Sequence, residues 1–203
     1  MPNCKNFTLL SAFLCAVVAG AGQAVAFGVP ALNGAAYTLP IITVASPEEP
    51  EGYRTSNYRA PVPKTLKGAT VLRTEQVLEL WDAKAARFID VLPRPPRPAG
   101  LAKGTIWRPP ARLNIPGSVW LANVGFGKVS PELEAYFKAH LEKISDGDRD
   151  APLVFYCLAK CWMSWNAGKR ALSYGYRNVY WYPDGTDGWS IAGRGLETSE
   201  PAP

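Results

Sequence analysis

The hydrophobic positions of the chain fall into short runs separated by helical patterns. Apolar and β-branched runs predict strands at residues 71–72, 87–92, 115–121, 152–156 and 178–182. Apolar residues at helical spacing predict helices at residues 75–83, 130–144 and 164–174. Thr74 is expected to cap the first helix, Pro131 to open the second, and Gly175 to end the third. Strands alternating with helices predict an α/β fold, with a central, mostly parallel sheet and helices on both faces.

The first 26 residues have the pattern of a secretory signal peptide. Lys5 precedes an apolar stretch at residues 7–22, and Ala24-Val25-Ala26 forms a cleavage motif before Phe27. The apolar stretch is short for a bilayer span, and a retained N-terminal anchor is the alternative. We therefore expect an exported, periplasmic protein with no membrane attachment after processing.

The rest of the chain divides by composition into three parts. Residues 27–70 form an extended lead-in, residues 71–197 hold the predicted sheet and helices, and residues 198–203 are a tail. A proline-rich insertion at 93–114 interrupts the middle part. It is interpreted either as a lid or docking surface beside the site, or as a surface loop without function. The lead-in tyrosines expected to lie across the domain surface are Tyr37, Tyr53 and Tyr58.

The charge of the chain is modest and dispersed. The sequence has 22 Lys and Arg residues against 17 Asp and Glu, a net charge of +5, which becomes +4 without Lys5. Nowhere do four like charges follow one another, whereas a protein that binds nucleic acid gathers Lys and Arg on one face. We therefore expect no nucleic-acid partner.

The few cysteines and the one histidine limit the available chemistry. Cys4 and Cys15 lie in the predicted signal peptide, which leaves Cys157, Cys161 and His140. Two thiols and one imidazole are too few for a tetrahedral zinc site, so no metal site is expected. His140 shares the apolar stripe of its predicted helix, which favours a packed or edge-of-core histidine over the base of a hydrolase triad.

The two remaining cysteines lie where α/β sheets bind ligands. The predicted strand 152–156 runs directly into Cys157, and residues 158–163 form a short loop before a helix at Ser164. This order places Cys157 at the carboxyl edge of a parallel strand, where ligands bind. Loop N–H groups and the helix N-terminus are expected to face its sulfur and lower its pKa, with Lys160 adding positive charge. Cys161 is near enough to form a disulfide with Cys157 or to resolve an adduct on it. We expect Cys157 to be the more acidic and faster-reacting thiol, and Cys161 the resolving one.

Structural explanations compete with this reactive interpretation. A structural disulfide or two buried thiols would account for the pair in an oxidising compartment, although closing so short a loop adds little stability. The aromatic residues nearby are interpreted as a rim over Cys157 or, alternatively, as part of the core. These aromatic residues are Trp162, Trp165, Tyr180, Trp181 and Tyr182.

At these residues the chain resembles rhodanese-like domains. The resemblance spans residues 71–197 and depends on a series of motifs in a fixed order. The motifs are Asp90-Val91, Ile115-Pro116-Gly117-Ser118-Val119, Val154-Phe155-Tyr156-Cys157, Gly175-Tyr176-Arg177-Asn178-Val179-Tyr180 and Asp184-Gly185-Thr186-Asp187-Gly188-Trp189. Within that superfamily, the segment from Cys157 to Trp162 is similar to exported proteins called PQQ-dependent catabolism-associated CXXCW motif proteins. Here three residues, rather than two, separate the cysteines.

The resemblance implies roles for individual residues. Cys157 would carry a persulfide or form a disulfide with Cys161, with no covalently bound cofactor, while Asp90 would be a structural acid and Trp189 a packing residue. A small sulfur or thiol substrate would contact Leu158, Ala159, Lys160, Trp162, Met163 and Ser164. The implied setting is periplasmic alcohol oxidation, and the implied partner is a PQQ-dependent dehydrogenase or its cytochrome.

Departures from the rhodanese pattern weaken ordinary sulfur transfer. Met163 stands where the related Cys-x5-Arg phosphatases have arginine, so the clamp for phosphate is missing. Leu158 and Ala159 replace small polar residues, which leaves Lys160 alone to meet a thiosulfate dianion. Three functions therefore compete: a thiol–disulfide or sulfane-sulfur relay through both cysteines, a catalytically silent accessory protein that docks onto a quinoprotein dehydrogenase or cytochrome, and a true thiosulfate sulfurtransferase.

Overall fold

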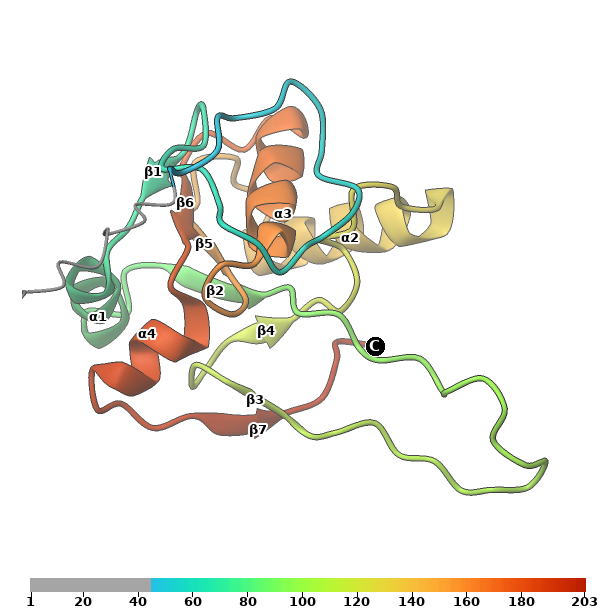
Figure 1. Ribbon diagram of the computed structural model, residues 1–203. Helices are drawn as coiled ribbons and strands as arrows, with labels where there is room; N and C mark the ends of the chain where they lie inside the picture. Colours follow the sequence, from blue (N-terminus) through green and yellow to red (C-terminus); the bar gives the residue numbers. More distant parts are fainter. Residues whose placement is uncertain (1–44) are drawn as a thin grey trace, which may run out of the picture. The chain divides into compact units, whose positions relative to one another are not determined.

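Five parallel strands form the centre of the structure, a computed structural model that describes residues 45–203 (Figure 1). The strands lie in the order β1-β6-β5-β2-β4, and each neighbouring pair is parallel. Their bounds are β1 (Thr70–Val71), β2 (Arg87–Asp90), β4 (Val119–Trp120), β5 (Leu153–Tyr156) and β6 (Val179–Tyr182). The central strand β5 is buried along its whole length, as expected for an apolar run in a sheet covered on both faces. The predicted α/β fold with a mostly parallel sheet is confirmed.

Helices cover the two faces of this sheet in pairs. They are α1 (Thr74–Asp82), α2 (Pro131–Ile144), α3 (Trp162–Ser173) and α4 (Gly185–Ile191). Phe137 of α2 and Ala167 of α3 share a buried cluster with Phe155 of β5. Val77 of α1 and Trp189 of α4 pack in a second cluster against the other face. Side chains alternate between the two clusters along β5, which is the period expected of a strand.

A short antiparallel ribbon joins the proline-rich insertion to the tail. β3 (Arg112–Asn114) pairs with β7 (Glu197–Ser199), and neither strand was predicted from the sequence. Beyond β7, the Ala202 N–H donates to the Trp120 carbonyl at 2.9 Å, beside β4. The last residues are therefore part of the folded domain rather than a free tail.

The third helix begins earlier than the sequence pattern predicted. α3 starts at Trp162, with Cys161 as its N-cap residue, whereas the pattern predicted a start at Ser164. Its end agrees with the prediction, because Gly175 follows the helix with a φ of +90°. The loop between β5 and α3 is therefore residues 157–161, with one cysteine at each end.

Two further local features differ from the prediction. Arg73 is the N-cap of α1, and the hydroxyl of Thr74 instead contacts the Tyr182 hydroxyl at 2.9 Å. Helix α4 begins after only two residues beyond β6, in a segment where the sequence pattern predicted no helix. The pattern of α4 is too short and glycine-rich to indicate a helix, and its formation is explained by the burial of Trp189 in the core.

Some predictions fall on residues that the structure does not describe. The signal peptide at residues 1–26 and Tyr37 lie outside the described residues. No helix within residues 45–203 is long and apolar enough to cross a membrane.

Candidate functional site

Cys157 lies at the carboxyl edge of the central strand, as the sequence predicted. Tyr156 ends β5 and is in register with Asp90 of β2 and Tyr182 of β6, so Cys157 is the first residue beyond the sheet edge. Cys157 and Cys161 are free thiols, with exposed fractions of 0% and 2%. The candidate site is therefore a buried dithiol at the edge where α/β proteins bind ligands.

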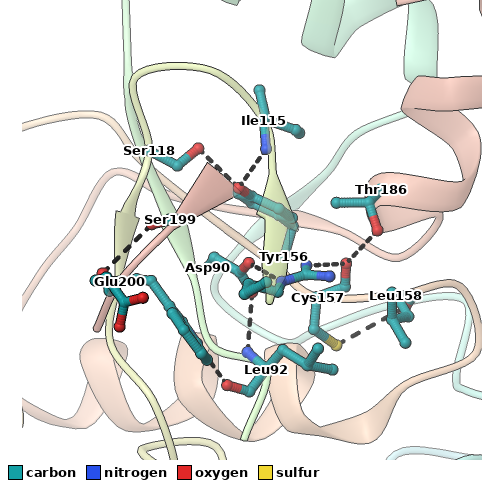
Figure 2. A network of polar contacts seen from close by, with 12 residues as sticks. Asp90, Leu92, Ile115, Ser118, Tyr156, Cys157, Leu158, Thr186, Ser199 and Glu200 are labelled. Carbon is teal, nitrogen blue, oxygen red and sulfur yellow. Dashed lines mark hydrogen bonds and ion pairs between the residues drawn. The ribbon is translucent and has the colours of Figure 1, made fainter. Parts of the chain in front are cut away.

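The two cysteines contact each other directly. The Cys157 thiol lies 3.6 Å from the backbone carbonyl of Cys161. It also lies 3.7 Å from the Leu158 carbonyl (Figure 2). An interaction between the two side chains also changes both pKa values. The short loop 158–160 therefore brings both cysteines into the same buried cluster.

The structure reverses the predicted order of thiol acidity. A hydrogen bond from Cys157 lowers the pKa of Cys161 to about 7, assisted by the N–H groups of Met163 and Leu158 and by the charge of Arg59. Burial raises the pKa of Cys157 well above its ordinary value, and the hydrogen bond with Cys161 raises it further. The prediction that Cys157 is the more acidic thiol is therefore wrong. The main cause is the hydrogen bond from Cys157, and α3, which starts at Trp162 with Cys161 as its N-cap residue, adds the Met163 N–H beside the Cys161 sulfur.

The loop between the cysteines is held on both sides by backbone contacts. Leu158 pairs with Gly185 at the start of α4, and the Ala159 N–H donates to the Asp187 carboxylate at 2.8 Å. Lys160 has a φ of +52°, a left-handed conformation that is uncommon for a residue with a side chain. Because a carboxylate occupies the Ala159 N–H, this part of the loop is not a free cradle for an anion.

The positive charge that affects the thiols does not come from the predicted residue. Lys160 is exposed, and the cation that lowers the pKa of Cys161 is Arg59. Arg59 pairs with Cys161 across an antiparallel bridge. Sequence order alone could not indicate this contact, because Arg59 precedes Cys161 by about a hundred residues in a segment without regular structure.

A buried ion pair contacts the backbone carbonyl of Cys157. Arg112 of β3 contacts the Asp90 carboxylate through Nε at 2.5 Å, and its Nη2 lies 3.4 Å from the Cys157 carbonyl. Asp90 and Cys157 are labelled in Figure 2. The same carbonyl accepts the Thr186 N–H at 3.1 Å. Burial raises the pKa of Asp90, and the neighbouring guanidinium opposes that shift. Asp90 is thus structural, as the resemblance implied, whereas Arg112 and Thr186 were missed.

The signal that could have indicated Arg112 is its position in the sequence. It is the last basic residue of the proline-rich insertion and is followed by the apolar turn at 115–121. An insertion that returns to the sheet edge must end near the site, but the pattern gave no reason to prefer this arginine over four other basic residues in the insertion.

A segment of the lead-in covers the dithiol. We call residues 53–63 the strap; in Figure 1 it runs across α3. The Trp162 N–H donates to the Tyr58 carbonyl at 2.9 Å, and the Ala60 N–H donates to the Lys160 carbonyl at 3.1 Å. Tyr53 also lies against the domain, with the Arg170 guanidinium 4.3 Å from its ring. Tyr53 and Tyr58 lie across the domain surface, as predicted.

Buried side chains hold the strap in place. The Asn166 amide accepts the Arg54 N–H at 2.9 Å and donates to the Arg54 carbonyl at 2.8 Å. The Tyr58 hydroxyl accepts the Gly127 N–H at 3.1 Å. The Trp162 indole donates to the Pro61 carbonyl at 3.0 Å. These contacts leave the thiols out of reach of a bulky reagent unless the strap moves.

The predicted substrate-binding residues divide into two groups. Leu158, Ala159 and Lys160 form the loop and are half-buried or exposed, while the remaining three begin α3 and are at most 3% exposed. Those three are Trp162, Met163 and Ser164. The Ser164 hydroxyl donates to the Cys161 carbonyl and accepts the Trp181 indole N–H. Contact of these six residues with substrate stays a prediction.

The aromatic residues near the site belong mainly to the core. Trp162, Trp165 and Trp181 form a buried cluster beneath the strap, and Tyr182 is fully buried on the other face of the sheet. The His140 ring lies 4.3 Å from the Tyr136 ring, tilted by 57°, and its Nε2 contacts the Pro203 carbonyl at 3.0 Å. Neither contact involves the cysteines. The core interpretation holds for the tryptophans and an edge-of-core position for His140.

Other features of the surface do not compete with this site. An apolar hollow of about 450 Å³ includes Trp81, Phe88 and Val119, but it lies toward the start of β2 and β4, away from the cysteines. Within residues 45–203, no three His, Cys, Asp or Glu side chains are grouped so as to hold a metal ion.

Several solved structures are similar to part of this chain. Among solved structures, the chain is similar to the polysulfide-sulfur transferase homodimer from Wolinella succinogenes, with 18% identity, a TM-score of 0.40, and coverage of 65% of this chain and 80% of that one. The human single-domain sulfurtransferase TSTD1 is 20% identical, with a TM-score of 0.38 and coverage of 60% and 95%. An uncharacterized protein from Saccharomyces cerevisiae has 20% identity, a TM-score of 0.38 and coverage of 61% and 92%.

The sequence itself gives the family. No curated protein matches the chain at a significant level. The model of the rhodanese-like domain matches residues 74–192, which are more than half of the chain and run from the first residue of α1 to just beyond α4. The chain therefore belongs to the rhodanese-like domain family.

Proposed function

We propose that this rhodanese-like chain is an exported dithiol protein that uses Cys157 and Cys161 for sulfane-sulfur or thiol–disulfide exchange. Membership of the family supports sulfur-transfer chemistry in general. The signal-peptide pattern at residues 1–26 supports export, and the resemblance of the cysteine segment supports a role beside periplasmic PQQ-dependent alcohol oxidation.

The observation that carries the proposal is the contact of the Cys157 thiol with Cys161, 3.6 Å from its backbone carbonyl. Cys161 has a pKa of about 7 and is partly thiolate near neutral pH, while Cys157 stays protonated beside it. A thiolate attacks sulfur far better than a thiol does, and a neighbouring thiol can then resolve the adduct. We therefore assign Cys161 as the attacking thiol and Cys157 as the resolving one.

Two exchange reactions follow from this assignment. With a persulfide donor R–S–SH, the Cys161 thiolate attacks the outer sulfur, R–S⁻ leaves, and Cys161 carries a persulfide. Cys157 then attacks the inner sulfur of that persulfide, and the departing sulfide takes the Cys157 proton and leaves as hydrogen sulfide. The cysteines end as a disulfide, so they are oxidised and the sulfane sulfur is reduced. With a substrate disulfide, the same two attacks release two substrate thiols.

The surroundings of the loop disfavour thiosulfate as the donor. A thiosulfate dianion needs several charge-assisted hydrogen bonds, each worth about 1.5–3 kcal/mol. The Ala159 N–H is already bonded to the Asp187 carboxylate, and the Trp162 N–H is bonded to the Tyr58 carbonyl. The Arg112 guanidinium, close to the Cys157 carbonyl, is committed to Asp90 and to that carbonyl. An uncharged or singly charged sulfur donor suits this loop better.

The test is the mass of the reduced protein after brief treatment with glutathione persulfide or oxidised glutathione. The wild type is expected to lose both thiol hydrogens and give a peptide cross-linked between Cys157 and Cys161. Cys157→Ser is expected to stop at a stable adduct on Cys161, and Cys161→Ser to react slowly. An adduct that accumulates on Cys157 in the wild type, with no cross-linked peptide, would overturn the assignment.

A second pair of assays separates the competing functions. Thiosulfate and cyanide should give little or no thiocyanate with the wild type, and strong turnover that survives Cys161→Ser would instead indicate an ordinary thiosulfate sulfurtransferase. Growth of the producing cell on an alcohol that needs the quinoprotein pathway should require both cysteines. Normal growth with both replaced by serine would favour the catalytically silent docking protein.

A further inference from the structure

A long proline-rich segment extends from the sheet edge that carries the cysteines. We call residues 93–111 the arm; it contains no helix or strand and links β2 to β3. In Figure 1 it runs out from the end of β2, turns, and returns to β3, away from the four helices. Its turns use Gly100 and Gly104, whose φ angles are +88° and +89°.

The arm has an unusual balance of charge for this chain. It carries Arg94, Arg97, Lys103 and Arg108, and no Asp or Glu occurs between Asp90 and Glu132. Within the described residues Arg94 lies 4.0 Å from Glu200, whereas the other three cations form no ion pair there. Residues 1–44 contain no Asp or Glu either. Three cations of the arm are therefore free to meet an external anion.

The arm also exposes apolar surface that the domain does not use. The Ile106 side chain is 85% exposed and Leu101 is 37% exposed. Apolar side chains that project between unpaired cations suit a partner surface that offers both carboxylates and an apolar patch.

Proline content lowers the cost of holding the arm in a binding conformation. Six of its nineteen residues are proline, and each proline fixes φ and has no backbone N–H. Stiff proline-rich segments lose little entropy on binding and are commonly recognised by protein grooves. The cations are mostly arginine, whose planar guanidinium suits bidentate pairing with carboxylates. An acidic protein therefore fits the arm better than a lipid surface, which attracts denser clusters of basic residues.

The base of the arm is attached to the site. The arm begins three residues after Asp90 and ends at the residue before Arg112. Asp90 and Arg112 form the buried ion pair against the Cys157 carbonyl. We propose that the arm is a docking element for a protein partner with an acidic surface, held beside the Cys157–Cys161 edge. This inference concerns binding and stands independently of the exchange chemistry proposed above.

The experiment begins with photo-crosslinking in the producing cell. A photoreactive residue is placed at Ile106 or, as a matched control, at Ile191 of α4, which is 88% exposed. The protein captured through position 106 is identified and purified, and its affinity for the full-length chain is measured at low and high salt.

Three variants make that affinity decisive. Reversal of Arg97, Lys103 and Arg108 to Glu is expected to weaken binding by roughly tenfold to a hundredfold at low salt, because three attractive rim charges become repulsive. A control variant makes the same change in net charge outside the arm, by reversing the exposed residues Lys64, Lys67 and Lys128 to Glu. Its binding should be nearly unchanged. Cys157→Ser with Cys161→Ser should bind like the wild type, which keeps this result separate from any failure of the exchange chemistry.

Several results would overturn the proposal. Equal capture at positions 106 and 191, or equal weakening by the two charge-reversal variants, would show that the arm is not the docking element. Capture of a second copy of this chain would indicate self-association instead. Arm-dependent binding to phosphatidylglycerol vesicles, without a protein partner of arm-dependent affinity, would assign the arm to a membrane surface.

Discussion

The Cys157 thiol lies 3.6 Å from the backbone carbonyl of Cys161, the residue that caps the N-terminus of α3. The Cys157 thiol, whose pKa burial raises, therefore lies against Cys161. The Cys161 pKa is lowered by the hydrogen bond from Cys157, by the Met163 N–H at the start of α3 and by the charge of Arg59. The pair therefore has an internal division of roles: an acidic sulfur that attacks and a buried sulfur that resolves.

The hydrogen bond from Cys157 is the largest cause of the low pKa of Cys161. Cys157→Ala removes the donor, so the Cys161 pKa is expected to rise from about 7 toward the ordinary value for cysteine, about 8.5. Cys157→Ser retains a donor and is the matched control, with a smaller shift. The thiolate absorbance of each variant, titrated with pH, measures both values. Indistinguishable titrations of the two variants would show that this hydrogen bond does not set the acidity.

The ion pair between Arg112 and Asp90 is expected to be essential to the fold at the site. Arg112→Ala leaves the fully buried Asp90 carboxylate without its cation, and breaking such a pair costs on the order of 3–5 kcal/mol in free energy of unfolding. Arg177→Ala, which breaks the exposed pair with Asp150, should cost at most about 1 kcal/mol. Urea denaturation measures both. Adding Asp90→Asn to Arg112→Ala should recover part of the loss, since the buried charge is then removed; no recovery would contradict this account.

Much of the sheet could be predicted because its strands are short, apolar and buried. The apolar runs at residues 152–156 and 178–182 have the length of a buried strand and are too short for a typical helix. β5 and β6 fall inside these ranges. The carboxyl-edge position of Cys157 followed from that order alone. β3 and β7 were missed because they are polar, short and stabilised by pairing between segments far apart in the chain.

The chemistry of the dithiol was harder to predict than its position. α3 starts two residues earlier than predicted, so its first N–H groups lie beside the Cys161 sulfur rather than the Cys157 sulfur. Helix ends are the least certain part of a sequence pattern. The contribution of Arg59 depends on the path of the strap, which has no periodic pattern to indicate it. Long-range contacts of irregular segments therefore account for most of what the sequence did not reveal.

The strap is expected to control access to the thiols. Tyr58→Phe removes the hydrogen bond from the Gly127 N–H, worth about 1 kcal/mol, and should increase the alkylation rate of both cysteines severalfold by favouring strap opening. Tyr136→Phe removes a similar hydroxyl contact, to the Ala202 carbonyl, at a distance from the strap. That control should lose similar stability without faster alkylation. Equal acceleration in the two variants would indicate global rather than local opening.

Gly185 allows the start of α4 to approach the cysteine loop. A Cβ at this position would lie 2.5 Å from the Cys157 carbonyl oxygen, and the φ of +52° disfavours any side chain. Gly185→Ala should therefore destabilise the protein by more than Gly193→Ala, which has a φ of +77° but open space around it. The control is expected to lose about 1 kcal/mol, for the backbone strain alone. Thermal unfolding compares the two, and equal losses would show that the close approach to Cys157 is not constrained.

The central claim is that Cys161, rather than Cys157, is the reactive thiolate. The most direct test is the alkylation rate of each cysteine in the reduced wild-type protein between pH 5 and 9, resolved by mass spectrometry of the two labelled positions. Cys161 is expected to react faster throughout, with a rate that rises through a midpoint near pH 7 and levels off, because its folded-state pKa is about 7. Cys157 should react slowly, with a rate still rising at pH 9, because burial raises its pKa. Faster labelling of Cys157, with a midpoint near neutral pH, would contradict the account.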